Sequence, residues 1–254
     1  MTSLDVVVVS LAGLACGIVN SVAGGGSLIL FPALLATGMS PLAANVTNSV
    51  ATWPGYLGGV AGFRDDLPNS RARLRPLVSA TVAGSTAGCV LLLVTPSAAF
   101  DVVVPFLVLV ATGLTAAQPW AKRRFTTRSD VSDRGVPVAA VVSVGLAAVY
   151  GGYFGGALGV IFLAVLGLTL ADSLVKLNAF KAVLSVADAS VSVVMFGMFG
   201  PVGWVAVAVA APATLLGGFV GARFARRLDE RVLRVVVVCL GLAVAAYLFV
   251  ADLG

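Results

Sequence analysis

Two glycine-rich stretches, AGGGS at Ala23–Ser27 and GGYFGGALG at Gly151–Gly159, interrupt long apolar runs of the chain. They occupy equivalent positions of an internal repeat, because a shift of about 130 residues places Gly25-Gly26 on Gly155-Gly156 and Asn48 on Asn178. A weak repeat in a very apolar chain, with helices broken at matching places, is typical of transporters, which bind their substrate where the repeats meet. These two stretches therefore decide the predicted fold.

The composition is that of a membrane protein. The 254 residues are 59% hydrophobic and 11% charged, whereas soluble domains average about 25% charged residues, and the mean hydropathy is +1.07. A helical span needs about 20 apolar residues, and continuous rather than alternating runs disfavour a membrane β-barrel. We predict an all-α polytopic membrane protein, with apolar runs near residues 5–37, 41–63, 74–94, 98–119, 136–170, 173–200, 201–222 and 235–251.

Several kinds of chemistry are disfavoured by residues that the chain lacks. It has no histidine, which removes His-based metal sites, Ser-His-Asp catalysis and histidine proton relays. Its three cysteines are scattered through apolar segments without a CxxC pair. Asp5, with no basic residue before it, disfavours a signal peptide in the first run. We therefore expect no enzyme, metal site or cofactor, and we disfavour a membrane-embedded enzyme and a transition-metal permease.

Positive charge is concentrated in three short segments, which hold 14 of the 16 Lys and Arg residues. Short basic loops normally stay cytoplasmic. We interpret the net charge of +5 as a topology signal with contact to anionic lipid headgroups, and not as nucleic-acid binding. The segments contain Arg64, Arg71, Arg73 and Arg75; Lys122, Arg123, Arg124, Arg128 and Arg134; and Arg223, Arg226, Arg227, Arg231 and Arg234.

These basic segments predict the topology. With all three inside, the run at 136–170 must leave and return to the same side, as two shorter helices or as a re-entrant hairpin, and the run at 5–37 is its counterpart. Each repeat then has about five helical segments, an odd number, so the second repeat is inverted and both termini lie outside. We expect a first repeat at 1–119, a basic cytoplasmic linker at 120–135 and a second repeat at 136–254.

A polar stripe marks the predicted helix at 173–200. Spacings of 3, 4, 3 and 4 place its members on one helix face, namely Asn178, Lys181, Ser185, Asp188 and Ser192. Lys181 and Asp188 lie about 10 Å apart along the axis, too far for a simple ion pair. A charge inside a span usually marks a transport pathway. We interpret Lys181 as a substrate residue and Asp188 as a proton-coupling residue; the alternative is that they hold helices together.

The equivalent stripe of the first repeat consists of small residues. After the shared Asn48 its members are Ala51, Gly55, Gly58 and Gly62. We expect the two helices to meet across a cavity, with polar groups on one side and space on the other. Asn45 and Thr47 add neutral groups that suit anion oxygens, with interhelical hydrogen bonds as the alternative. Backbone N–H groups at Gly25, Gly26 and Ser27, at the start of a helix, could bind an anion; close helix packing is the alternative.

Three stretches carry a resemblance to a known family: AGGGSLILFPALLATGMSPLAANVTNSVATWPGYLGG (Ala23–Gly59), NAFK (Asn178–Lys181) and GARFARRLDERVLR (Gly221–Arg234). They resemble the TauE/SafE family of sulfite exporters. The resemblance implies a multi-pass transporter of sulfur oxyanions such as sulfite or sulfoacetate in the plasma membrane, the inner membrane of a bacterial cell. The family also includes members assigned to other small organic anions. The second repeat departs from it, since FGGALGV stands where members often carry a fuller glycine cluster and a proline-containing helix.

We therefore expect a secondary transporter, in the exporting direction, that binds a small sulfur-containing anion near the midplane between the repeats. An anion channel or uniporter for another small organic anion is the alternative. The expected partners are this anion and membrane lipid, without nucleic acid, and a homodimer is an open option. The expected substrate-binding residues are Lys181, Asn178, Asn48, Thr47, Asn45, Ser185, Gly25, Gly26 and Ser27, with Asp188 for coupling.

Overall fold

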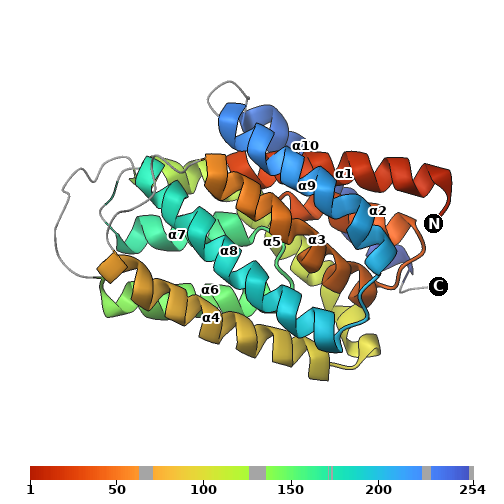
Figure 1. Ribbon diagram of the computed structural model, residues 1–254, viewed down its shortest axis with the longest axis horizontal. Coiled ribbons are helices and arrows are strands. Elements are labelled where there is room, and N and C mark those ends of the chain that lie inside the picture. Colours follow the sequence, from red (N-terminus) through yellow and green to blue (C-terminus); the bar gives the residue numbers. More distant parts are fainter. Residues whose placement is uncertain (63–70, 126–135, 171, 173, 225–229, 252–254) are drawn as a thin grey trace.

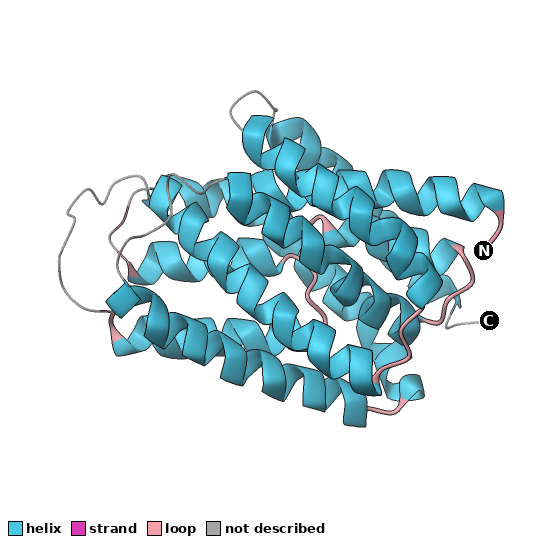
Figure 2. Ribbon diagram, in the orientation of Figure 1, coloured by secondary structure: helices cyan, strands magenta, loops and turns pink. Residues whose placement is uncertain are grey.

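The computed structural model describes the chain except residues 63–70, 126–135, 171, 173, 225–229 and 252–254. The described residues form ten α-helices and no strand (Figures 1 and 2). This confirms the all-α fold. Most of the predicted linker, and Arg64, Arg128, Arg134, Arg226 and Arg227, lie outside the described residues. The helices are α1 (Ser3–Val22), α2 (Ser27–Ala36), α3 (Pro41–Gly62), α4 (Arg71–Val94), α5 (Ser97–Phe125), α6 (Val138–Tyr153), α7 (Leu158–Thr169), α8 (Leu174–Phe199), α9 (Trp204–Phe224) and α10 (Glu230–Ala251).

Six of the described helices are long and apolar enough to cross a membrane, namely α1, α4, α5, α8, α9 and α10. Helices α2, α6 and α7 are apolar but shorter. Helix α3 has 22 residues but is not among the six, because a polar stretch from Asn45 to Ser49 lowers its hydropathy. The chain is thus a multi-pass membrane protein in which one long helix is polar along part of its length.

Both long runs with glycine clusters are broken where predicted. The run at 5–37 becomes α1 and α2, and the run at 136–170 becomes α6 and α7. Figure 2 shows loop segments in the interior of the bundle as well as at its ends. The inverted orientation of the second repeat, the positions of the termini relative to a membrane and the repeat boundaries remain predictions.

The helices of the two halves are interleaved in two bundles. In the first bundle, α9 packs along both α1 and α3; in the second bundle, α4 packs along both α6 and α8. Figure 1 shows α1 and α9 on one side of the molecule and α4 and α6 on the other. The two bundles meet where α3 contacts α8, and α5 packs against α10. Each bundle therefore contains helices from both halves of the chain.

Glycines bring the helix backbones together inside each bundle. An added Cβ atom at Gly88 of α4 would overlap the carbonyl oxygen of Val149 on α6. In the first bundle, an added Cβ atom at Gly17 of α1 would overlap the carbonyl oxygen of Thr214 on α9. Close backbone approach through small residues is how helices associate in a membrane, where lipid is as apolar as the side chains.

The small stripe of α3 serves the same kind of packing. Added Cβ atoms at Gly55 and Gly58 would lie 2.9 Å from the Thr214 carbonyl oxygen and 2.6 Å from the Leu215 carbonyl oxygen, both on α9. These two glycines therefore bring α3 against α9, and do not leave space opposite α8 as the sequence suggested. The sequence could not show this, because close packing and an open cavity both favour small residues.

Gly88→Ala is expected to lower the stability of the protein, because the new methyl group would overlap the α6 backbone. Overpacking of this kind typically costs about 1–3 kcal/mol. The measurement is the melting temperature of the purified protein in detergent. The control is Gly113→Ala on α5, where an added Cβ atom meets nothing within 4 Å, and where helix propensity alone should raise stability by up to about 1 kcal/mol. Equal melting temperatures for both variants would contradict the packing argument.

Candidate functional site

The break between α1 and α2 is held by side-chain hydrogen bonds from α1 and α5 and by glycine backbone. Gly24 and Gly25 have φ values of +81° and +87°, which glycine adopts without strain. The Asn20 side chain accepts a hydrogen bond from the Gly26 N–H at 2.8 Å. From α5, the buried Gln118 amide donates to the Ala23 carbonyl oxygen at 2.5 Å. Polar backbone at membrane depth must be satisfied inside the protein, and these two side chains supply that.

The break between α6 and α7 is built in a similar way. Gly155 has a φ of +72°, and Ala157, at the start of α7, has a φ of +57° in the left-handed region. The Asn45 amide of α3 donates to the carbonyl oxygen of Tyr153, the last residue of α6, at 3.0 Å. The two breaks also touch, since an added Cβ atom at Gly24 would lie 3.0 Å from the backbone nitrogen of Val160.

A first cavity, here called the Lys181 cavity, lies between α1, α3, α7 and α8. Its volume is about 20 Å³, room for one or two water molecules. Lys181 is only 3% exposed, and its Cδ atom lies 3.6 Å from the position of an added Cβ atom at Gly159. Gly159 therefore leaves room for the lysine stem at the first turn of α7. The lining residues are Asn20, Ser21, Tyr56, Gly59, Gly159, Lys181, Ala182 and Ser185.

A second cavity, here called the Asp188 cavity, is also lined by Tyr56 and also has a volume of about 20 Å³. Asp188 is 4% exposed and Asn48 is 3% exposed. The Oδ1 atoms of both residues have no hydrogen-bond partner within the described part of the chain. The lining residues are Ser27, Asn48, Ser49, Thr52, Tyr56, Gly151, Gly155, Leu158, Asp188, Ala189 and Ser192.

The two cavities divide the residues that the sequence singled out. Lys181 and Ser185 line the first, whereas Asn48, Ser27 and Asp188 line the second. The polar stripe of α8 thus faces two small spaces, one at each charged residue. Tyr56 lines both cavities, so the residues expected around one anion are distributed over two small spaces, and their contact with a common anion remains a prediction.

The other predicted site residues line neither cavity. Thr47 is fully buried, and its hydroxyl accepts a hydrogen bond from the Gly203 N–H at 2.9 Å, at the loop between α8 and α9. Asn45 bonds to the end of α6, and Gly26 bonds to Asn20, as described above. Gly25 packs against Thr115, and Asn178 is partly buried on α8. Substrate contacts by these residues remain predictions.

Two of the residues with the largest roles were not singled out by sequence reasoning. Tyr56 follows Pro54 and Gly55 and looks like a packing residue, since nothing in its spacing connects it with the α8 stripe. Gln118 lies near the end of α5, where a single amide in an apolar run was the only signal. Asn20 and Ser21 are polar residues just before the first glycine cluster, and from the sequence they are weaker candidates than the stripe on α8.

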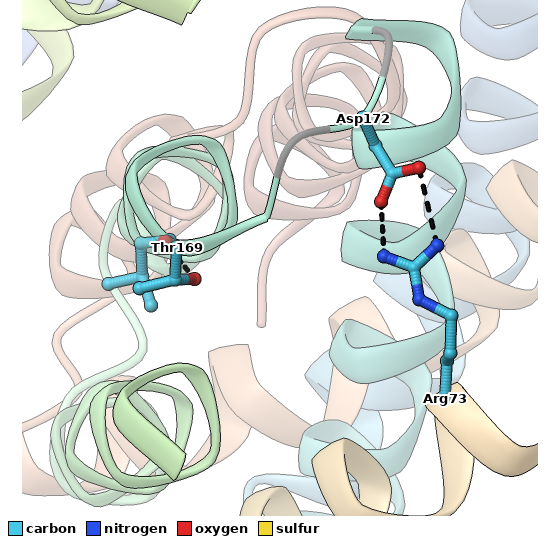
Figure 3. A network of polar contacts seen from close by, with 4 residues as sticks. Arg73, Thr169 and Asp172 are labelled. Atoms are coloured by element: carbon cyan, nitrogen blue, oxygen red, sulfur yellow. Dashed lines mark hydrogen bonds and ion pairs between the residues drawn. The ribbon is translucent and has the colours of Figure 1, made fainter. Parts of the chain in front are cut away.

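An ion pair fixes the N-terminal end of α8, close to the Lys181 cavity. The Arg73 guanidinium at the start of α4 contacts both carboxylate oxygens of Asp172, one of them at 3.3 Å (Figure 3). The guanidinium also lies 5.4 Å from the centre of the Phe180 ring, the residue before Lys181. The Asp172 side chain is 2% exposed and that of Arg73 is 22% exposed. Arg73 thus joins α4, α8 and the segment that precedes α8.

Within the described ranges, no three His, Cys, Asp or Glu side chains are grouped so that they could hold a metal ion. The free thiols of Cys16 and Cys89 are buried. Cys89 lies 3.7 Å from the Ser192 hydroxyl, beside the Asp188 cavity.

Comparison with known proteins gives one consistent result. The family model described as "Sulfite exporter TauE/SafE" matches residues 9–248. The chain is 28% identical over 237 residues to the probable membrane transporter protein YfcA of Escherichia coli, covering 91% of this chain and 85% of that protein. It is 27% identical over 241 residues to a probable membrane transporter protein of Haemophilus influenzae, covering 92% and 90% of the two chains. No solved structure matches it significantly.

Arg73→Ala is expected to destabilise the protein more than Asp172→Ala. The first change leaves a buried carboxylate without its partner, which costs about 3 kcal/mol or more, whereas the second leaves a guanidinium that can reach water. The measurement is the melting temperature in detergent of both single variants and the double variant. Equal losses for the two single variants would show that burial of Asp172 does not determine the strength of this contact.

Proposed function

The chain belongs to the sulfite exporter TauE/SafE family of membrane transporters, and from this we propose that it is a secondary transporter for a small sulfur-containing anion such as sulfite or sulfoacetate. The observation that carries the proposal is Lys181, a lysine that is 3% exposed and lines a cavity between the two halves of the chain. A charge inside a membrane span usually marks a transport pathway. A bound anion would interact favourably with this charge.

The surroundings of Lys181 suit an anion better than a cation. The lining of the cavity offers the hydroxyl of Ser185 and the amide of Asn20, and it includes no Asp or Glu among the described residues. Gly159 belongs to the first turn of α7, where the helix dipole places partial positive charge. The lysine charge and the helix end therefore act with the same sign on whatever occupies the cavity.

The cavity in the described conformation is closed. Its volume of about 20 Å³ holds little more than one water molecule, whereas sulfite has four heavy atoms. In our proposal the anion enters when the helices around α3 and α8 separate, as expected for alternating access at a fixed site. This accounts for a carrier that shows no open passage.

We further propose that the protein acts in the plasma membrane and that export is its working direction. A membrane potential that is negative inside favours the exit of an anion by about 2.3 kcal/mol per charge for each 100 mV. A divalent anion produced in the cell would gain twice this amount. In this proposal Asp188 is the coupling residue, seven positions after Lys181 on the same helix, and the protein carries out no catalytic step.

Lys181→Met is expected to reduce sulfite uptake into proteoliposomes by about 100-fold or more at low substrate concentration. Methionine keeps most of the apolar stem but removes the charge, whose interaction with an anion at about 4 Å is worth about 4 kcal/mol at an effective dielectric constant of 20. The matched control is Lys176→Met, at an exposed lysine of the same helix. The measurement is initial uptake of labelled sulfite and of labelled sulfoacetate, with and without a pH gradient.

Saturable counterflow of labelled sulfite would support a carrier, and uptake that does not saturate would favour an anion channel instead. Normal uptake by folded Lys181→Met would show that this lysine is not the substrate residue. Absence of uptake of both anions by folded wild-type protein would overturn the proposed substrate class.

Ser185→Ala is expected to raise the KM for sulfite by about tenfold while leaving folding intact, because one hydrogen bond to a charged ligand is worth about 1.5 kcal/mol or more. The control is Ser190→Ala on the same helix. The Ser190 hydroxyl accepts from the Trp53 indole at 2.9 Å and lines neither cavity. The measurement is the concentration dependence of uptake. Equal KM values for the two variants would place Ser185 outside the anion site.

A further inference from the structure

We propose that the Asp188 cavity is a binding site for one monovalent cation, and that this cation is Na⁺. The inference identifies the ligand of Asp188 and so deepens the proposed function. It stands on the geometry of the second cavity, whose lining includes the Asp188 carboxylate and does not include Lys181.

Two buried acceptor oxygens face this cavity. The Oδ1 atoms of Asp188 and Asn48 belong to side chains that are 4% and 3% exposed, and within the described residues neither has a hydrogen-bond partner. Buried polar atoms are nearly always satisfied, by protein, water or an ion. Two such oxygens on facing helices, α3 and α8, call for a donor or a cation between them.

The hydroxyl groups around the cavity strengthen this argument. The Ser49 hydroxyl donates its proton to the Asn45 carbonyl oxygen at 3.0 Å, and the Thr52 hydroxyl donates to the Ser49 carbonyl oxygen at 3.2 Å. With their protons used, these hydroxyls present only lone pairs to the cavity. Oxygen lone pairs are the ligands that hard cations prefer.

The charge of the site matches one positive charge. Asp188 is the only charged residue in the lining formed by described residues, which otherwise supplies an amide, hydroxyls and apolar groups. The ends of three helices also contribute: Gly151 lies in the last turn of α6, whereas Ser27 and Leu158 begin α2 and α7. The negative end of α6 offsets one of the two positive ends, and the remaining end carries about half a positive charge, less than the full negative charge of Asp188. One carboxylate with neutral oxygens suits a monovalent ion better than a divalent ion.

The size of the cavity limits the occupant to a single ion without its hydration shell. A volume of about 20 Å³ is close to that of one or two water molecules, so a dehydrated Na⁺ or K⁺ fits. The carboxylate of Asp188 favours Na⁺ between the two, because the smaller ion comes closer to the carboxylate oxygen and gains more Coulomb energy.

A cation in this cavity would affect the anion in the other. The two charged residues are about 10 Å apart along α8, and opposite charges at that distance change each other's affinity by roughly tenfold at an effective dielectric constant of 20. Tyr56 lines both cavities, so its position depends on both occupants. A change in the position of Tyr56 would therefore couple binding of the cation to binding of the anion.

The test is thermal unfolding of the purified full-length protein in detergent, without any anionic substrate, in NaCl, KCl and choline chloride at equal ionic strength. At a Na⁺ concentration ten times the Kd, we expect a rise in melting temperature of about 3–5 °C that K⁺ and choline do not give. Asp188→Asn should abolish the rise, and the isosteric Thr52→Val should reduce it several-fold. Asp5→Asn, at the N-terminal end of α1, is the control that should keep it.

Each outcome has a consequence. No response specific to Na⁺, or an equal response in Asp188→Asn, would overturn the proposal, as would stabilisation by acid alone, which would make Asp188 a proton site. If Asp188→Asn does not fold, Thr52→Val decides in its place. A Na⁺ response without sulfite transport would support this site and contradict the proposed function. Sulfite counterflow without any Na⁺ response would support the proposed function and contradict this site.

Discussion

The structure depends on one constraint: a helix broken inside a membrane protein must have its free backbone groups satisfied by other parts of the chain. Three side-chain amides meet it. Gln118 donates to the last carbonyl before Gly24, Asn45 donates to the carbonyl that ends α6, and Asn20 accepts from the N–H group of Gly26, the residue before α2. These bonds stabilise the chain where α1 and α6 end and where α2 is about to begin. They also fix both cavities, because each cavity is lined by a residue in the first turn of a broken helix.

The break between α6 and α7 serves both charged residues of α8. An added Cβ atom at Gly159 would lie 3.6 Å from the Lys181 stem, and one at Gly151 would lie 2.7 Å from the Asp188 carboxylate. A side chain at Gly151 would displace the Asp188 carboxylate, whereas a Cβ atom at Gly159 would be in ordinary contact with the lysine stem. The glycine cluster therefore has two roles, since Gly155 supplies the positive φ needed for the turn and Gly151 leaves space for the Asp188 carboxylate. The sequence suggested only a break and a nearby helix start.

Periodicity accounts for what the sequence predicted well. The stripe on α8 follows from helical spacing, and four of its members, Lys181, Ser185, Asp188 and Ser192, do line the cavities. The division into two cavities could not be predicted, because it depends on the rotation of α3. Thr47 and Asn48 are neighbours in sequence but about 100° apart around the helix, so Thr47 reaches the α8–α9 loop and Asn48 reaches the Asp188 cavity. No sequence pattern separates those two directions.

The arrangement of the bundles indicates where the closed cavities can open. In the first bundle, Gly17 and Gly55 bring α1 and α3 into backbone contact with α9; in the second, Gly88 brings α4 into backbone contact with α6. Separating such close-packed backbones would leave uncompensated gaps. The contact between α3 and α8 is of a different kind, because polar side chains and two small cavities lie along it. Movement of one bundle against the other would therefore part the molecule along α3 and α8, where Tyr56 lines both cavities, and would open the spaces beside Lys181 and Asp188 together.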